Sequence, residues 1–239
     1  MIRARWRALL AILVAAVALG FMIARRGPEP LPPRPASERP TLLLLTSLPL
    51  MFGEGFSLQQ TGSSAVKALE TRYRVVPISV ADPADLGKGR LLLMAHPPAQ
   101  PAEDLVALDQ WVRGGGRVLL LADPMLEWPS ERPVGDPLRP PPIFMDTGLL
   151  AHWGLRLDAP EERGAVRKEL GGFDVITASP GRLFGKCEIS EDRMVARCTL
   201  GKGRATIVAD ADILDMPHLG AGAGHNFDAV LAELARLET

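Results

Sequence analysis

Side chains that could do chemistry follow the apolar runs of this chain. Ser47 comes just after one such run, His96 after a second, Asp123 after a third, and Asp210 and Asp212 after the last. Serine, histidine and aspartate together are the components of a nucleophilic triad. The three aspartates are oxygen ligands of the kind that a hard divalent cation takes. The residue types therefore allow either hydrolysis or metal binding.

The neighbours of these residues argue against both chemistries. A nucleophile in an α/β fold needs a sharp strand-to-helix turn flanked by small residues. Asp123-Pro124 stands at that turn, and Ser47 is followed by Leu48-Pro49. The Asp-x-Asp pair at 210 and 212 has no phosphate loop with it. We therefore expect no catalytic residue, no metal and no cofactor. A periplasmic hydrolase using Ser47, His96 and an aspartate remains the alternative.

The elements that must position these residues alternate along the chain. Apolar runs of strand length alternate with helical patterns, and this alternation predicts an α/β domain with a mostly parallel sheet. The strands are expected at 41–46, 73–80, 91–96, 117–122 and 205–209, and the helices at 62–73, 102–113, 144–154 and 226–237. Residues 155–200 are expected to leave the parallel sheet as β-hairpins. Pro77 places the second strand near a sheet edge.

Parallel strands bring their carboxyl ends to one edge, where ligands bind in such sheets. The segment 125–142 contains six prolines and little periodicity, so we expect it to lie over this edge. The predicted ligand or partner surface comprises Ser47, His96, Asp123, Asp210, Asp212 and Asn226, which begins the last helix. A small-ligand sensor that closes over an acidic cleft is a further reading of this surface.

The amino terminus has the pattern of a membrane anchor. Arg3, Arg5 and Arg7 precede the uncharged stretch 8–24, and Arg25-Arg26 follow it. Seventeen residues are about the minimum for a spanning helix. We predict a transmembrane anchor over 1–26, a Pro-rich linker over 27–40 and an α/β domain over 41–239. A cleaved signal peptide and a buried core helix are the alternatives. The excess of arginines before the stretch keeps the amino terminus cytoplasmic and the domain periplasmic or extracellular.

The two cysteines offer a test of that location. Cys187 and Cys198 bracket a sequence that reads as a hairpin turning at Asp192-Arg193. A two-residue loop there places the cysteines opposite each other, within reach of a disulfide that an oxidising compartment permits. Two small buried residues that merely face each other are the alternative.

Composition excludes one class of partner. The net charge is −1 and aromatic residues make up 5% of the chain. A neutral surface with few aromatic side chains does not favour nucleic acid. We therefore expect no nucleic-acid partner.

Several motifs resemble one family in the same order along the chain. They are LLLMAHPPAQPAEDLVALDQWVRGGGRVLLLADP, MDTGLLAHWGLRLD, GKGRATIVADADIL and HNFDAVLAEL, between residues 91 and 237. They look like the extracytoplasmic domain of the gliding-motility (GldG-type) auxiliary components of ABC transport systems. The wider group has a class I glutamine-amidotransferase-like fold. The resemblance thus implies a flavodoxin-like or amidotransferase-like sheet with flanking helices and a hairpin excursion.

The resemblance also implies a function. The amidotransferase nucleophile would lie about where Asp123-Pro124 stand, which implies a domain without enzymatic activity. We expect a binding or scaffolding domain, anchored in a bacterial-type inner membrane through residues 8–24. Its implied partners are the permease and ATPase subunits of an ABC-type transporter.

Overall fold

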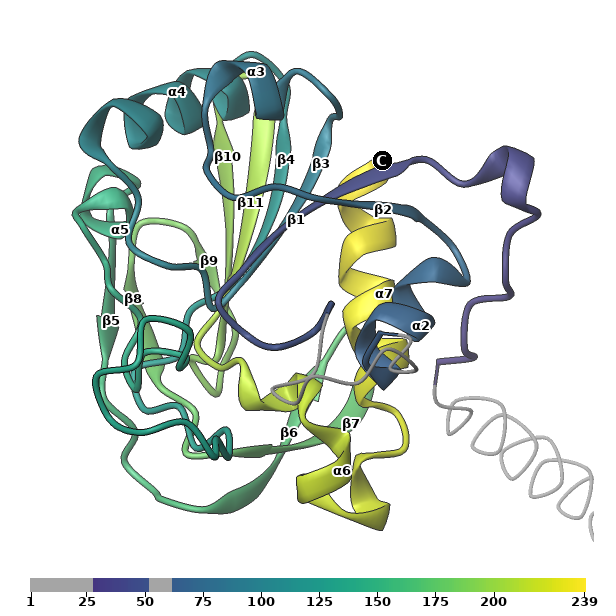
Figure 1. Ribbon diagram of the computed structural model, residues 1–239, viewed down its shortest axis with the longest axis vertical. Helices are drawn as coiled ribbons and strands as arrows, with labels where there is room; N and C mark the ends of the chain where they lie inside the picture. The colour runs from purple at the N-terminus through teal and green to yellow at the C-terminus, as the bar shows by residue number, and fades with distance from the viewer. Residues whose placement is uncertain (1–27, 52–61) are drawn as a thin grey trace, which may run out of the picture. The chain divides into compact units, whose positions relative to one another are not determined.

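A computed structural model describes residues 28–51 and 62–239 (Figure 1). Residues Leu31–Thr239 form one compact unit. The predicted anchor over 1–26 lies outside the described residues. Within those that are described, none of the helices has the length and apolar character needed to cross a membrane.

The domain is built on one seven-stranded sheet. Its strand order is β2-β1-β3-β4-β11-β10-β9. The strands from β2 to β11 in this order are parallel, β10 is antiparallel to β11, and β9 is antiparallel to β10. The strands are β1 (Thr41–Thr46), β2 (Arg74–Pro77), β3 (Leu91–Ala95), β4 (Arg117–Leu121), β9 (Glu188–Ile189), β10 (Val195–Leu200) and β11 (Gly203–Val208). The predicted mostly parallel α/β sheet is therefore confirmed, and β2 lies at an edge as Pro77 indicated.

Two hydrophobic layers cover the two faces of this sheet. Leu42 and Leu44 of β1 point into one layer, and Leu43 and Leu45 point into the other. A strand buried on both faces reads as a continuous apolar run, as Thr41–Thr46 does. All four leucines are at most 1% exposed. The central strands are thus held rigidly from both sides.

Helices cover both faces of the sheet (Figure 1). Helices α2 and α7 pack on one face, and α3, α4 and α5 pack on the other. Their bounds are α2 (Ser64–Glu70), α3 (Pro83–Leu86), α4 (Ala102–Arg113), α5 (Leu149–His152), α6 (Met216–Leu219) and α7 (Asn226–Glu238), with short 3₁₀ turns η1 (Ala36–Glu38), η2 (Asp212–Leu214) and η3 (Ala221–Ala223).

Two helices are shorter than the sequence predicted. The first expected helix, 62–73, spans Ser64–Glu70, because the Ser63 side chain caps it by accepting from the Val66 N–H. The expected helix 144–154 reduces to α5. Asp146 Oδ1 accepts from the N–H groups of Gly148 and Leu150, at 3.0 and 3.3 Å, so it fixes a turn before the helix begins.

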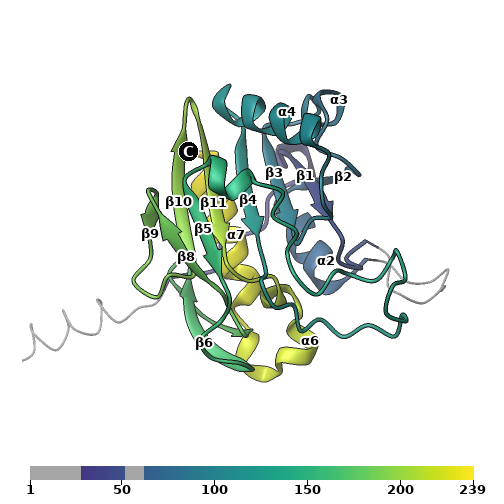
Figure 2. The same ribbon diagram turned by 90° about the vertical axis from the view of Figure 1, so that its left-hand side faces the viewer.

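The excursion between α5 and β10 forms two small sheets (Figure 2). Strand β5 (Leu155–Asp158) pairs with β8 (Arg182–Gly185), and β6 (Ala165–Leu170) pairs with β7 (Phe173–Ala178), both antiparallel. Strand β7 also contacts α7 and η2. The excursion therefore reaches back to the carboxyl-end edge of the main sheet.

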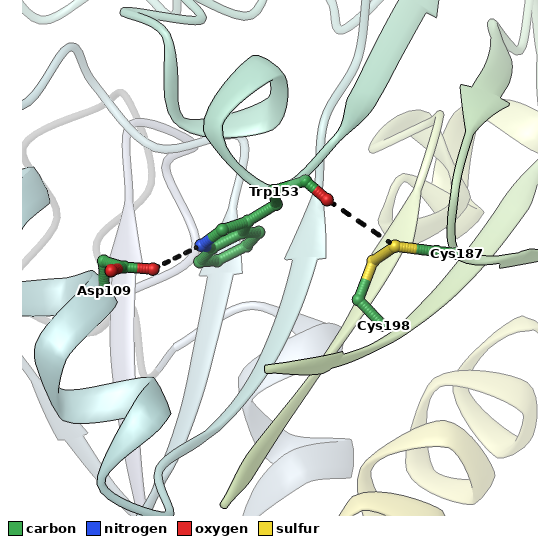
Figure 3. The surroundings of a disulfide bond; sticks show 4 residues. All are labelled: Asp109, Trp153, Cys187 and Cys198. Atoms are coloured by element: carbon green, nitrogen blue, oxygen red, sulfur yellow. Dashed lines mark hydrogen bonds between the residues drawn. A yellow bond between two sulfur atoms is a disulfide. The ribbon is translucent and has the colours of Figure 1, made fainter. Parts of the chain in front are cut away.

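The β9–β10 hairpin carries the two cysteines. Its register pairs Ile189 with Ala196, as the two-residue turn predicted. Cys187 and Cys198 are joined in a disulfide, and Cys187 Sγ lies 3.9 Å from the Trp153 carbonyl oxygen (Figure 3). The Trp153 indole N–H donates to Asp109 at 3.0 Å. The disulfide thus connects, through Trp153, to α4.

Residues 31–40, assigned from the sequence to the linker, pack against the domain. Arg34 donates twice to the Glu238 carboxylate at the end of α7, at 2.9 and 3.1 Å. Its guanidinium also lies 5.6 Å from the Tyr73 ring. Arg72 donates to the Pro32 carbonyl. The chain therefore enters β1 along a fixed path.

Candidate functional site

The carboxyl ends of β1 and β3 meet where the strand order reverses. The Ser47 hydroxyl, after β1, donates to the His96 carbonyl oxygen at 2.5 Å, and the Ser47 N–H reaches the same oxygen at 3.2 Å. Ser47 is thus brought beside His96, but its hydroxyl donates to a backbone carbonyl. In a triad the hydroxyl donates to the imidazole, so the geometry does not supply an activated serine.

His96 is fully buried and has a left-handed backbone with φ 45°. Its Nε2 lies 2.8 Å from the Pro141 carbonyl oxygen. A carbonyl only accepts, so Nε2 carries the proton. Burial lowers the pKa of His96, and the hydrogen bond to Pro141 opposes that shift. His96 is therefore a neutral donor that holds the segment above it.

Asp123 follows β4 and is also fully buried. Its two carboxylate oxygens accept from the N–H groups of Met125 and Ala211, at 2.8 and 2.9 Å. Its carbonyl oxygen accepts from the Phe144 N–H at 2.6 Å. Burial raises the pKa of Asp123 to about 6, although these backbone donors oppose the rise. Asp123 joins both ends of the segment 125–142 to the end of β11.

The other two aspartates extend this buried group. Asp210 accepts from the Ile213 N–H at 2.9 Å, and Asp212 accepts from the Glu127 N–H at 2.8 Å. Burial, followed by the charge of Asp123, raises the pKa of Asp210 well above its ordinary range. The same causes raise the pKa of Asp212 to about 8. No group of three or more His, Cys, Asp or Glu side chains within 28–51 and 62–239 could hold a metal ion.

Asn226 lies beside the aspartates and is bonded to the backbone next to Asp212. Its amide oxygen accepts from the Ile176 N–H at 3.1 Å, and its amide nitrogen donates to the carbonyls of Ile176 and Ile213 at 2.7 and 2.9 Å. It is fully buried. Asn226 therefore fastens the start of α7 to β7 and η2.

The segment 125–142, with Ile143 to Met145 after it, lies over the edge and is here called the roof. Besides the bonds to His96, Asp123 and Asp212, the Leu126 N–H donates to the Pro142 carbonyl at 3.0 Å. The Ser179 hydroxyl, beyond β7, donates to the Glu127 carboxylate. Leu126 and Trp128 pack on the core. The roof thus closes the edge that the sequence predicted to be a binding surface.

The roof also exposes large apolar side chains, which the pattern of its sequence does not indicate. Five large apolar side chains are conspicuously exposed in the described part of the chain, and four of them belong to the roof. They are Val134 (91% exposed), Leu138 (68%), Ile143 (55%) and Met145 (53%), with Val106 (57%) on α4. The signal in the sequence was single aliphatic residues within a Pro-rich stretch, which periodicity does not detect.

Cavities lie away from the six predicted residues. A cavity of about 330 Å³ between α4 and α5 is lined by Leu105, Val106 and Leu149 and also by polar side chains, among them Asp109 and His152. A second, of about 860 Å³, lies at the opposite edge of the sheet, beside Arg90 and Arg117. Neither of these two cavities has any of the six in its lining. The strand-end residues form hydrogen bonds that join segments of the chain to one another.

The fold and this edge define a class: a doubly wound α/β domain whose usual ligand-binding edge is closed by its own chain. A family model described as an ABC-type uncharacterized transport system matches residues 39–161. The match covers half of the chain. The chain therefore belongs to this family of auxiliary components of ABC-type transport systems.

Solved structures show the same fold at low sequence identity. The mmIFT52 N-terminal domain is 12% identical, with a TM-score of 0.55 over 83% of this chain and 97% of that one. A cytoplasmic protein of Salmonella typhimurium, STM3548, is 11% identical, with a TM-score of 0.50 over 83% of this chain and 98% of that one. No curated protein matches the chain.

Part of a larger enzyme also aligns with the chain. The exo-β-1,4-mannosidase Op5Man5 from Opitutaceae bacterium strain TAV5 is 13% identical, with a TM-score of 0.48 over 96% of this chain. The chain spans only 39% of that enzyme's length.

Proposed function

We propose that this chain is a membrane-anchored, extracytoplasmic domain that binds the permease of an ABC-type transporter and has no enzymatic role. The exposed apolar side chains of the roof carry this proposal. Four of the five large apolar side chains that are exposed in the described part of the chain lie in this one segment, and exposed apolar patches mark sites of protein interaction. Family membership supports transporter subunits as the partners.

The roof presents these side chains in a fixed arrangement. Asp136 braces its outer part, because Oδ1 accepts from the Leu138 N–H at 2.8 Å and Oδ2 lies 3.5 Å from the Arg132 guanidinium. The Asp136 N–H donates to the Pro133 carbonyl at 3.1 Å. An ordered loop loses little conformational entropy on binding. Val134 and Leu138 are thus suited to act as anchors in a partner's pocket.

The apolar surface continues from the roof onto α4. Met145 and Leu105 line one small cavity, and Leu105 and Val106 line the adjacent cavity of about 330 Å³. A hollow beside exposed apolar side chains accepts an apolar side chain from a partner. The docking surface therefore includes the roof and the outward side of α4.

The strand-end edge supports a role without catalysis. The Ser47 hydroxyl donates a hydrogen bond to a carbonyl, and both Asp123 carboxylate oxygens accept from backbone N–H groups. The His96 imidazole is hydrogen-bonded to the Pro141 carbonyl. A catalytic group must reach a substrate. These groups are instead buried and used within the chain.

We further propose that the domain is GldG-type and descends from an amidotransferase-like fold. The five parallel strands run in the order 2-1-3-4 followed by β11, which corresponds to the flavodoxin-like order 2-1-3-4-5. Asp123-Pro124 stands after β4, where the resemblance places a nucleophile. The anchor over residues 8–24 and the periplasmic location belong to the same proposal, and the Cys187–Cys198 disulfide supports an oxidising compartment.

Site-directed photocrosslinking in native membranes tests the proposed function. A photoreactive amino acid replaces Leu138, and adducts are identified by mass spectrometry. We expect an ABC permease subunit, with the ATPase recovered in the same complex. Adding Val134→Glu should abolish the adduct. Ala165→Glu, at an exposed position of β6, is the matched control and should leave it intact. Adducts without any transporter subunit, or equal loss in the control, would overturn the proposal.

A further inference from the structure

The edge of the sheet opposite the roof contains an open cavity of about 860 Å³. It lies at the amino ends of the parallel strands, where β1, β3 and β4 begin. Its walls include Pro40-Thr41, the turn 87–91, Trp111, the glycine turn 114–116 and Glu238 at the end of α7. The chain enters the domain at this edge, because Pro40 and Thr41 are the last residue before β1 and the first residue in it.

Positive charge concentrates around this cavity. Arg90 and Arg117 line it, and the Arg117 guanidinium lies 3.4 Å from the carbonyl oxygen of Lys202. Arg204 is the register partner of Arg117 on the neighbouring strand β11. Like charges on neighbouring positions repel each other. Arg90 and Arg117, which line the cavity, and Lys202 and Arg204 beside Arg117 are here called the basic edge. A bound anion would reduce the repulsion between them.

The carboxylates near the basic edge are already engaged. Asp85 pairs with Lys88, Asp109 with Arg113, and Glu238 with Arg34. Within residues 28–51 and 62–239, no carboxylate forms an ion pair with Arg90, Arg117, Lys202 or Arg204. Among the described residues, no ion pair balances the positive charge of the basic edge, and Glu238, which also lines the cavity, is already paired with Arg34.

Beside the glycine turn, Arg90 is exposed and Arg117 is partly exposed. Gly115 has φ +118°, and a Cβ there would lie 3.7 Å from the Arg90 guanidinium. The N–H groups of Gly114, Gly115 and Gly116 all donate to carbonyls of α4, so they are not free for a ligand. Binding must therefore come from the guanidinium groups, which match phosphate oxygens in a bidentate way.

We propose that the basic edge binds the phosphate group of an organic anion. The cavity is larger than inorganic phosphate needs, and Trp111 gives it an apolar wall. Two sources share this chemistry: a soluble phosphomonoester and the headgroup of an anionic phospholipid. The entry of the chain at this edge favours the headgroup, and that part alone depends on the proposed membrane anchor.

The test uses the full chain in nanodiscs. In phosphatidylcholine discs, calorimetry measures binding of glycerol phosphate. In discs with phosphatidylglycerol, hydrogen exchange measures protection of the turns 87–91 and 113–117. Arg90→Gln with Arg117→Gln should weaken either signal by about tenfold or more per arginine. The control, Arg163→Gln with Arg167→Gln, removes equal charge from an exposed segment and should change neither.

The outcomes separate the two sources and the two proposals. Calorimetric binding that the first double variant loses assigns a soluble phosphomonoester, and protection only in phosphatidylglycerol assigns the headgroup. No signal in either arm, or equal loss in the control, overturns the phosphate site. Neither arm depends on a permease, so failure of the crosslinking experiment leaves this result unaffected.

Discussion

Asp212 offers a direct test of the buried carboxylate group. The variant Asp212→Asn keeps an oxygen that can accept from the Glu127 N–H, but it has no proton to lose. In the folded protein burial and the charge of Asp123 raise the pKa of Asp212 to about 8. The carboxylates of Glu127 and Asp215 also face it and add to the rise. In the unfolded chain its pKa returns to about 3.9.

The sign of the effect follows from proton binding. Between about pH 4 and pH 8 the folded state holds a proton on Asp212 that the unfolded state has released. The free energy of unfolding therefore falls as pH rises, by about 1.4 kcal/mol per pH unit for this proton. From pH 5 to pH 7 the loss is about 3 kcal/mol. Asp123, with a pKa of about 6, adds to the slope below pH 6.

Asp212→Asn should remove its share of this slope. At pH 7 the variant should be more stable than the original chain by about 2 to 4 kcal/mol. The original chain must protonate Asp212 when it folds at this pH, and the variant does not pay this free energy. At pH 4 the two should be nearly equal. Urea unfolding followed by tryptophan fluorescence from pH 4 to pH 8 measures both quantities.

Asp174→Asn is the control for Asp212→Asn. Asp174 lies on β7 with its side chain 71% exposed, so its replacement should not alter the slope. The reasoning is refuted if Asp212→Asn keeps the original slope, or if it is less stable than the original chain at pH 7. Either result would mean that Asp212 is ionised in the folded protein.

Three further changes test the fold and the roof. Replacing Cys187 and Cys198 by alanine should lower the free energy of unfolding by about 3 kcal/mol, measured in urea against the oxidised chain; an unchanged midpoint would contradict this. Gly203→Ala should prevent stable folding, because a Cβ there would lie 1.9 Å from the Val112 carbonyl oxygen; a native circular dichroism melt would count against the packing described. His96→Asn should speed hydrogen exchange of the roof about tenfold with little change in the global melt, because it removes the bond to Pro141; unchanged exchange would show that the roof is held otherwise.

The parallel sheet could be predicted because its local signals agree with its tertiary setting. Thr41–Thr46 is apolar throughout, and the structure buries it on both faces. Helix α4 has the predicted bounds, with its acidic first turn and glycine end. The short helix α5 could not be predicted as such, because the capping by Asp146 and the φ of +103° at Gly148 depend on a turn that apolar periodicity does not show.

The site could be predicted only in part. Strand ends of a parallel sheet meet at one edge, so His96, Asp123 and Asp210 were expected near one another, and the electrostatic coupling of Asp123 with Asp210 agrees. Their accessibility depends on where the chain 125–142 returns. That path is decided by contacts far apart in sequence, such as Glu127 with Asp212. No local pattern encodes them.

We expect the two edges of the sheet to bind different kinds of partner. The carboxyl-end edge is covered by the roof, which offers apolar side chains to a protein. The amino-end edge offers guanidinium groups to phosphate. Strands of five or six residues separate these edges by about 20 Å, and the strands between them are buried on both faces. Effects of substitutions at sites so far apart usually add. Leu138→Glu should therefore leave glycerol phosphate binding unchanged, and Arg90→Gln should leave the Leu138 adduct intact. A loss of both functions from either change would show that the two edges form one binding surface.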